Sequence, residues 1–371
     1  MVPSHHCSVF ARLRLTTLAR PLLAVSVVAS LVVGLTIGAD ARPAPIGQDP
    51  VNPGAVYSGD FPDPGVLRIG RTYYAYSTTS DGLNVPMLWS RDLRHWRAAP
   101  GSPSNPRGDA LPRVPRWSTG ESTPDGRMHT TTWAPSVVRL GPGRYVMSYA
   151  TEVHGAKGTR MCVSIATATS PFGPFVDRTS TPTVCPARGA IDPQIYKAPN
   201  GRPWLLWRAD HFPALLITQP MNWSGTSVLA SGKRRVLARV AQRWEGSIIE
   251  NPAMIRYRHR WYLFYSANSY ASPRYGIGYL ICKRWNGGCR RPQNGPLLRT
   301  GGAISGPGGG TPFLDSGGHL RLAYHAWTTG AVGYPDSVKC RKAPQGCAQR
   351  RLRVALLFAT KRGTLRVMSR R

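Results

Sequence analysis

The chain has 371 residues, of which 42% are hydrophobic and only 18% charged, and its formal net charge is +31. This apolar content is sufficient to bury a core, and one large domain or two would fit the length. The 39 glycines and 34 prolines, together with scarce helix-period patterns, argue against a helical fold and favour many short strands and turns.

The N-terminus has the layout of a secretory signal. Three arginines between residues 12 and 20 precede an apolar run over residues 21–38, and Ala39-Asp40-Ala41 follows as a small-x-small cleavage site. We expect cleavage after Ala41, which makes residues 1–41 a signal peptide and the protein secreted, extracellular or cell-wall associated. The run is long for a signal, so an uncleaved anchor is the alternative. No later stretch is long and apolar enough to span a bilayer.

Removal of the signal also removes Cys7 and leaves six cysteines. An even number in an exported chain favours disulfides, whose connectivity the sequence leaves open. Pairing of near neighbours predicts Cys162–Cys185, Cys282–Cys289 and Cys340–Cys347. Zinc is the rival interpretation, but no C-x-x-C pair and no Cys/His cluster supports it.

The excess of positive charge persists in the mature chain. Residues 1–41 hold three arginines and one aspartate, which leaves a net charge of +29. Such a surface should adsorb to polyanions such as anionic cell-wall polymers, acidic lipids or nucleic acid. The alternative is that the arginines are merely solvated. The cations are dispersed and no nucleic-acid motif accompanies them, so no specific nucleic-acid partner is expected.

One sequence unit recurs five times. Each copy starts at a proline, continues as an apolar run, turns, and ends in an aromatic-rich strand. The prolines are 64, 135, 193, 252 and 312, with spacings of 71, 58, 59 and 60 residues. This period predicts an all-β fold, a five-bladed β-propeller with four antiparallel strands in each blade around a central axial site. A β-sandwich is the alternative, but five evenly spaced, similar units argue against it.

The repeats also divide the chain. Residues 42–60 are expected to form a linker or cap, and residues 61–360 the propeller. A long insertion over residues 99–130, rich in Pro, Ser and Arg, explains the one long spacing. Residues 361–371 are expected to form a basic tail.

Acidic residues recur at one position of the repeat. The residue before each repeat proline is Asp63, Ala134, Asp192, Asn251 or Thr311, and Glu250 lies one residue earlier in the fourth copy. Equivalent positions of the blades surround one axis, so three carboxylates should meet in one pit. Each aspartate could instead cap a turn. Glu245 competes with Glu250, and Asp60, outside the repeat register, competes with Asp63.

Grouped carboxylates suit the hydrolysis of glycosidic bonds. An inverting enzyme uses one carboxylate as a base on water and one carboxylic acid to protonate the leaving oxygen, about 6.5–9.5 Å apart. Clustered acids also separate one another's pKa values, so that one stays protonated while another is ionised.

Several segments resemble glycoside hydrolase family 43 in their order and spacing. Phe61-Pro62-Asp63-Pro64 is similar to the family's base motif, Ile191-Asp192-Pro193 to its Ile-Asp-Pro motif, and Glu250-Asn251-Pro252 to its acid motif. Further similar pieces are Trp133-Ala134-Pro135, residues 170–175 and residues 275–279. The likeness covers residues 60–330.

The resemblance implies roles for individual residues. Asp63 would be the general base, Glu250 the general acid, and Asp192 the residue that raises the pKa of the acid and orients it. Phe61 and Trp133 would flank the sugar, although each could serve in the core instead.

One departure from the family concerns metal binding. Many members carry Gly-Pro-Gly-His in the fifth blade, with the His near an ion or water at the axis, whereas this chain has Gly306-Pro307-Gly308-Gly309-Gly310. This puts a structural calcium ion in doubt, and no cofactor is expected to be required. His325 could partly substitute and contact substrate, or it could be a core or surface residue.

The leading hypothesis is therefore a secreted glycosidase that cleaves arabinose- or xylose-containing polysaccharides or oligosaccharides with inversion. The sequence does not choose among arabinofuranosidase, arabinanase and β-xylosidase. Three alternatives remain: a non-catalytic propeller that binds cell-wall glycans, a sucrose- or fructan-acting relative that retains configuration, and a structural protein that binds polyanions.

Overall fold

The computed structural model describes residues 54–103, 105–119, 121–122, 128–129, 131–155, 158–327, 332–334 and 348–368. These all belong to the larger of the chain's two units, residues 43–371. The predicted signal peptide and the predicted Cys340–Cys347 pair lie outside the described residues. In the described part, no helix is long and apolar enough to cross a membrane.

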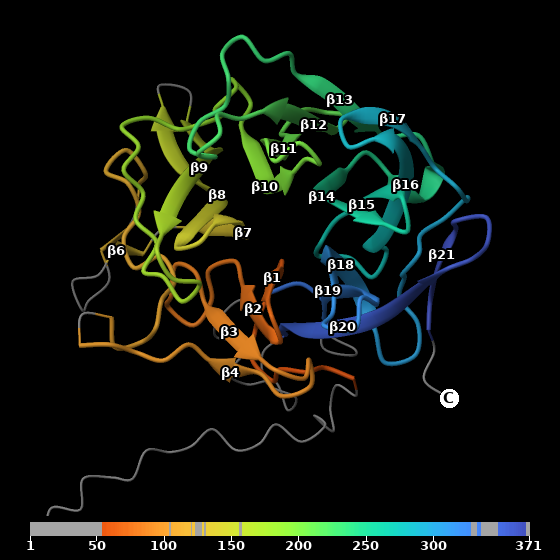
Figure 1. The fold of residues 1–371 in the computed structure, drawn as a ribbon, viewed down its shortest axis with the longest axis horizontal. Coiled ribbons are helices and arrows are strands. Elements are labelled where there is room, and N and C mark those ends of the chain that lie inside the picture. The colour runs from red at the N-terminus through yellow and green to blue at the C-terminus, as the bar shows by residue number, and fades with distance from the viewer. Residues whose placement is uncertain are drawn as a thin grey trace, which may run out of the picture. The chain divides into compact units, whose positions relative to one another are not determined.

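Five antiparallel sheets form a ring of blades, as the repeats predict (Figure 1). Four of them are four-stranded meanders. The strands of blade 1 are β1 (Gly65–Ile69), β2 (Thr72–Tyr76), β3 (Met87–Ser90) and β4 (Arg97–Ala98); those of blade 3 are β10 (Ala190–Lys197), β11 (Pro203–Ala209), β12 (Leu215–Pro220) and β13 (Arg235–Arg239). Those of blade 4 are β14 (Ile249–Tyr257), β15 (Arg260–Ala267), β16 (Gly276–Arg284) and β17 (Gly287–Arg290); those of blade 5 are β18 (Ser305–Leu314), β19 (Leu320–Trp327), β20 (Arg350–Ala359) and β21 (Leu365–Val367).

Blade 2 is the irregular one. It has three strands, β7 (Thr132–Gly141), β8 (Arg144–Gly155) and β9 (Gly158–Ala168). Single bridges from Val176 and Val184 to β9 take the place of a regular fourth strand. The predicted insertion before this blade contains a small hairpin, β5 (Glu121–Ser122) and β6 (Met128–His129). The one helical turn among the described residues is η1 (Arg243–Glu245).

The core lies between the blades rather than within one layer. Five clusters of buried apolar side chains each join two neighbouring blades, and together they cover all five interfaces of the ring. Aromatic residues from the second strands, such as Tyr76, Tyr149 and Phe264, are fully buried in them. The aromatic-rich second strand of the repeat therefore exists because each blade packs face to face against the next.

The ring closes through the segment before β1. The backbone N–H groups of Val56 and Phe61 donate to the carbonyls of Leu352 and Arg350 in β20 of the last blade, both at 2.9 Å. Residues 55–61 thus join the first blade to the last.

Two features differ from the sequence-based expectation, namely one segment boundary and one register position. Residues 361–368 complete blade 5 through β21, with Leu365 buried, where a basic tail is predicted. In β18 the residue equivalent to Asp63 is Gly309 and not Thr311, because β18 has an additional bulge. A glycine run gives no side-chain pattern, and Pro312 lies two residues beyond the position that its counterparts occupy.

The meander order gives the ring two different faces. The first strand of each blade begins beside the axis at one end of the ring, which we call the site face. The turn that leads from it to the second strand, and the turn between the third and fourth strands, lie at the opposite end, the far face. Residues near the start of β10 or β14 therefore lie on the site face, and turns such as β14–β15 lie on the far face.

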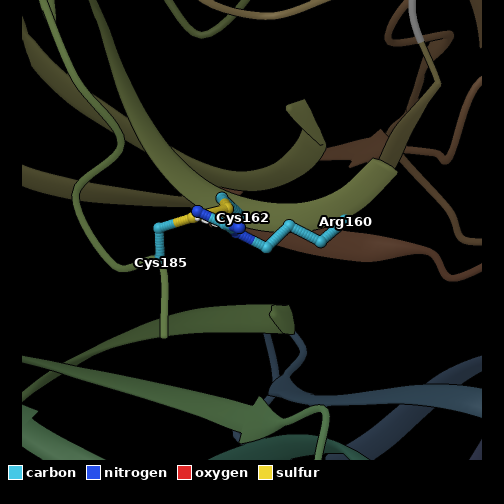
Figure 2. The surroundings of a disulfide bond; sticks show 3 residues. All are labelled: Arg160, Cys162 and Cys185. Atoms are coloured by element: carbon cyan, nitrogen blue, oxygen red, sulfur yellow. Dashed lines mark hydrogen bonds between the residues drawn. A yellow bond between two sulfur atoms is a disulfide. The ribbon is translucent and has the colours of Figure 1, made fainter. Parts of the chain in front are cut away.

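Two of the predicted disulfides are confirmed, Cys162–Cys185 and Cys282–Cys289. The first joins β9 to the segment that forms the outer edge of blade 2, where Arg160 Nε donates to Cys185 Sγ at 3.2 Å (Figure 2). The second links the paired strands β16 and β17. The first therefore fastens a blade edge that has no continuous fourth strand.

We predict that the Cys162–Cys185 bond stabilises the protein more than the Cys282–Cys289 bond. It closes the longer loop, with a sequence separation of 23 against 7, and loop entropy then predicts stabilisation of about 3.5 against about 2.5 kcal/mol. Double Cys→Ser variants of each pair, compared by the urea midpoint of unfolding, measure this. A larger loss for the Cys282–Cys289 pair would contradict the loop-entropy explanation.

Candidate active site

A strained residue stands near the start of four of the five innermost strands, on the site face. Asp63, Ala134, Asp192 and Asn251 have φ angles of 50°, 45°, 53° and 52°, and each precedes a proline. Residues before proline favour extended backbone, and left-handed φ costs a non-glycine residue roughly 1–2 kcal/mol. In β7, β10 and β14 this residue lies in a β-bulge. Such bulges redirect side chains and are common at functional sites.

The pocket around Asp63 favours the ionised carboxylate. Thr78 Oγ1 donates to Asp63 Oδ2 at 2.8 Å, and Arg350 Nη1 lies 3.3 Å from the same oxygen. Burial alone would raise the pKa of Asp63, but the charge of Arg350 and the bond from Thr78 hold it below its ordinary value. Asp63 is therefore a carboxylate that stays ionised in a largely buried position.

His325 fixes the backbone of Asp63 rather than pairing with its charge. The backbone N–H of Asp63 donates to His325 Nδ1 at 3.0 Å, so that nitrogen carries no proton. Burial lowers the pKa of His325 to about 3, and the ring is neutral although Nδ1 also lies 3.4 Å from Asp63 Oδ1. The ring is completely buried and stacks on Tyr275 with centroids 6.0 Å apart.

Glu250 lies between a cation and a phenol. Arg208 Nη1 donates to its Oε2 at 3.1 Å, and the Tyr275 hydroxyl donates to its Oε1 at 2.7 Å. Burial raises the pKa of Glu250, while Arg208 and Tyr275 oppose the increase and the charge of Asp63 adds to it. The net increase makes Glu250 a proton donor closer to neutral pH than an exposed glutamate.

Asp192 lies next to Glu250 and shares its titration. Its Oδ2 accepts the backbone N–H of Asn251 at 2.9 Å. Burial raises the pKa of Asp192 well above its ordinary value, and the charges of Glu250 and Asp63 raise it further. Two coupled carboxyls of this kind retain one proton between them over a wide pH range.

The guanidinium of Arg350 is enclosed by aromatic rings. It lies 5.2 Å from the centroid of Tyr270, 5.7 Å from Trp327 and 5.2 Å from Tyr334. Arg350 Nε donates to the Tyr334 hydroxyl at 2.9 Å, and the backbone N–H of Arg350 donates to Asp60 Oδ1 at 2.6 Å. The cation beside Asp63 is thus held in place by stacking and hydrogen bonding.

The structure brings Asp63, Asp192, Glu250 and His325 together, as the sequence predicts. Trp133, beside the bulge of β7, is 37% exposed and remains available to a ligand. Phe61 is 1% exposed and packs in the core between blades 1 and 5, so the prediction that it flanks a sugar is wrong. The sequence pattern shows an apolar residue beside Asp63 but not which side of the strand it faces.

The two competing acids have structural roles. Glu245 is completely buried, where Arg291 Nε pairs with its Oε1 at 2.6 Å and the Tyr265 hydroxyl donates to it at 2.6 Å. Asp60 accepts hydrogen bonds from Arg350 and from the Tyr334 hydroxyl.

Four site residues were missed by the sequence analysis: Thr78, Arg208, Tyr275 and Arg350. Thr78, Tyr275 and Arg350 lie at or beyond the ends of second or third strands, and not at the repeat position before the proline where the acids recur. Tyr275 begins the segment 275–279, whose resemblance to family 43 was the one sequence signal for any of these four residues.

The residues at the axis do not fit a cation held by protein ligands. His325 Nε2 is buried without a hydrogen-bond partner among the described residues, which would suit a water molecule. In the same part of the chain, however, no three His, Cys, Asp or Glu side chains are grouped so that they could hold a metal ion, and Arg350 already supplies positive charge. We therefore assign no metal to this site.

Comparison with known proteins places these observations in a family. Residues 52–338 match the model of glycosyl hydrolases family 43. An extracellular endo-α-(1→5)-L-arabinanase from Thermotoga petrophila is 27% identical over 30% of this chain and 22% of its own length. A β-D-galactofuranosidase from Aspergillus niger is 22% identical over 73% of this chain and 75% of its own length. The chain thus spans about a fifth of the arabinanase.

The fold is also similar to that of a solved structure. The crystal structure of a thermostable family-43 glycoside hydrolase superposes with a TM-score of 0.68 at 23% identity, covering 88% of this chain and 96% of that chain.

We predict that Gly309→Ala destabilises the protein far more than Gly318→Ala. Both glycines have left-handed φ, 60° and 77°, so each alanine costs about 1–2 kcal/mol of backbone strain. A Cβ on Gly309 would also lie 2.6 Å from both Asp63 Oδ1 and His325 Nδ1, whereas one on Gly318 meets nothing within 4 Å. Urea unfolding of the two variants measures the difference, and equal losses would show that Gly309 is not needed for packing around Asp63.

Proposed function

The chain belongs to glycosyl hydrolases family 43, and on that basis we propose that it is an exported glycoside hydrolase that cleaves arabinose- or xylose-containing glycans with inversion. The observation that carries the proposal is the divergence of three neighbouring carboxyl groups. The pKa of Asp63 is lowered, while those of Asp192 and Glu250 are raised. Separated pKa values within one site mark a base and an acid.

In the proposed reaction, Asp63 removes a proton from a water molecule whose oxygen attacks the anomeric carbon. The bond from that carbon to the leaving oxygen breaks at the same time, and Glu250 gives its proton to this oxygen. Arg350 keeps Asp63 ionised, and the Tyr275 hydroxyl fixes the orientation of Glu250 through Oε1. Asp192 keeps the acid protonated, since each ionised carboxylate disfavours the ionisation of the other.

The substrate class rests on the relatives. The curated matches include an arabinanase, a galactofuranosidase and an arabinofuranosidase, and these names specify glycans of arabinose or of furanose sugars. This supports furanosides as the first substrates to test, followed by xylosides. The signal peptide predicted for residues 1–41 supports export and a polymeric substrate outside the cell.

Asp63→Ala should abolish hydrolysis of every aryl furanoside or xyloside that the enzyme accepts, whereas Glu250→Ala should lose less on activated leaving groups. A dinitrophenolate leaves without a proton, so the acid matters little there, while a sugar leaving group needs it. Rates with dinitrophenyl glycosides and with oligosaccharides measure this, and general catalysis predicts losses of roughly 10²–10⁴. Equal losses of Glu250→Ala on both substrates would contradict its role as the acid.

The unchanged protein and these variants also distinguish the alternative functions. NMR of the first-formed sugar should show the inverted anomer, whereas retention would favour a nucleophilic aspartate as in the sucrose- or fructan-acting relatives. Binding of arabinan or xylan without turnover of any of these substrates would favour a non-catalytic glycan-binding propeller.

Asp192→Asn and Arg208→Gln should move the alkaline limb of kcat/KM in opposite directions. Glu250 must be protonated, so activity falls as pH rises through its raised pKa. Asp192 and Glu250 titrate as a pair, so loss of the Asp192 carboxyl removes the like charge that holds the last proton of the pair and moves the limb to lower pH. Loss of the Arg208 cation raises the pKa of Glu250 and moves the limb to higher pH. Shifts of about one pH unit are expected for such close charges, and pH–rate profiles measure them. Movement in the same direction would show that the limb does not report Glu250.

A further inference from the structure

The far face carries a strained turn that the proposed chemistry does not use. In the other four blades, the turn from the first to the second strand contains a glycine at positive φ: Gly70, Gly143, Gly201 or Gly318. In blade 4 this turn is Arg258-His259, with φ angles of 45° and 65°. Two-residue turns with positive φ at both positions strongly favour Asn-Gly, so a bulky cation and an imidazole here cost stability. Such strain indicates a function for the side chains.

The cations around this turn form one surface from two blades. We call it the basic turn surface; its residues are Arg256, Arg258, Arg260, Lys283, Arg284, Lys361 and Arg362, all exposed. The Tyr262 hydroxyl donates to the Gly363 carbonyl at 2.9 Å, which joins the β14–β15 turn to the β20–β21 turn. Trp261 and Trp285, with ring centroids 6.0 Å apart, join it to the β16–β17 turn. Blade 4 and β21 lie side by side in Figure 1.

No carboxylate neutralises this surface. The sequence has no Asp or Glu from Asn251 to Leu314 or from Ala348 to Arg371. Across the described ranges, none of the seven cations forms an ion pair with an acidic side chain. Arg256 lies 5.1 Å from the ring centroid of Trp261, and Arg258 lies 5.3 Å from that of Tyr257. Stacking holds these guanidinium groups while their N–H edges remain able to bind oxyanions.

We propose that the basic turn surface docks an acidic polysaccharide, so that the enzyme is retained on a carboxylate-bearing glycan while its active site stays open. Guanidinium groups suit carboxylates because they can bind both oxygens. The surface is built from hairpin turns of adjacent blades, without a helix in the described chain that could enter a DNA groove. The choice of a glycan over other polyanions rests on the proposed function, because the substrate is itself a polysaccharide. Since these turns are at the far face, a docked polymer does not cover Asp63 or Glu250.

The test variant removes four cations without weakening the fold. It combines Arg258→Asn and His259→Gly, which give the turn its preferred residues, with Arg256→Gln, Arg260→Gln and Arg284→Gln. A matched control removes the same number of charges from the far-face turns of blades 1 and 2: Arg68→Gln, Arg71→Gln, Arg139→Gln and Arg144→Gln, all exposed. Urea unfolding verifies that both variants are folded.

Binding of both variants and the unchanged protein is measured with polygalacturonate at low salt, with its methyl-esterified form as the uncharged comparison. We expect the test variant to bind polygalacturonate about tenfold or more weakly and the control to stay within about twofold. Binding of the esterified polymer should not differ among the three proteins, because this polymer offers these cations no carboxylate. Hydrolysis of soluble aryl glycosides should be the same in all three, and binding is read independently of it, so failure of the proposed activity would be seen separately.

Several results would overturn the proposal. Equal losses in both variants would show that net charge alone drives adsorption, and no loss in either would show that the surface is merely solvated. Tighter binding of DNA or of anionic lipid vesicles than of polygalacturonate, with the same dependence on the four cations, would assign the surface to another polyanion.

Discussion

The site depends on a ring of polar contacts that join each blade to the next near the starts of the innermost strands. Thr78 Oγ1 accepts the backbone N–H of Ala134, the Ser148 hydroxyl donates to the Pro193 carbonyl, and Asp192 accepts the N–H of Asn251. The N–H of Gly309 donates to the Ser266 hydroxyl, and that of Asp63 donates to His325. All five interfaces therefore have such a contact. Buried backbone donors must find partners, and four of the five left-handed residues find them across the interface. The strain that aims the carboxylates is thus offset by contacts that also hold the ring together.

This arrangement explains why the three carboxylates differ although all three lie near the starts of innermost strands. Their pKa values are set by the second layer of residues, which comes from later strands. Asp63 has Arg350 beside it and Glu250 has Arg208, whereas the hydrogen bond that Asp192 accepts within the described part of the chain comes from a neutral backbone donor. Burial by itself acts to raise the pKa of all three carboxyls. The strength of the opposing contacts decides whether the net shift is upward or downward. The repeat supplies positions for carboxyl groups, and the surrounding cations give each its chemical role.

The sequence was sufficient for the blades and the acids, and insufficient for the residues around them. The X-Pro repeat marks the left-handed residue of each of the first four blades, so Asp63 and Asp192 could be found from the register and Glu250 from the position just before it. In blade 5 the bulge is made of glycine, and Pro312 gave the wrong residue, Thr311. Arg208 and Arg350 could not be selected among 48 lysines and arginines, because their roles depend on which blade closes against which. Phe61 failed for the same reason: its burial is decided by packing between the first and last blades.

The positive charge of the chain and the chemistry of its pit are physically separate. A net charge of +31 would lower the pKa of every carboxyl if it acted over long distances, yet those of Asp192 and Glu250 are raised. Burial prevails because exposed charges beyond about 8 Å are screened at physiological ionic strength, while groups in the pit interact at short range in a medium of low polarity. Only cations that reach the carboxylates directly, Arg208 and Arg350, affect the pKa values of the site. The remaining positive charge affects how the protein interacts with its surroundings. Surface cations can therefore be substituted without altering the pKa values of the site.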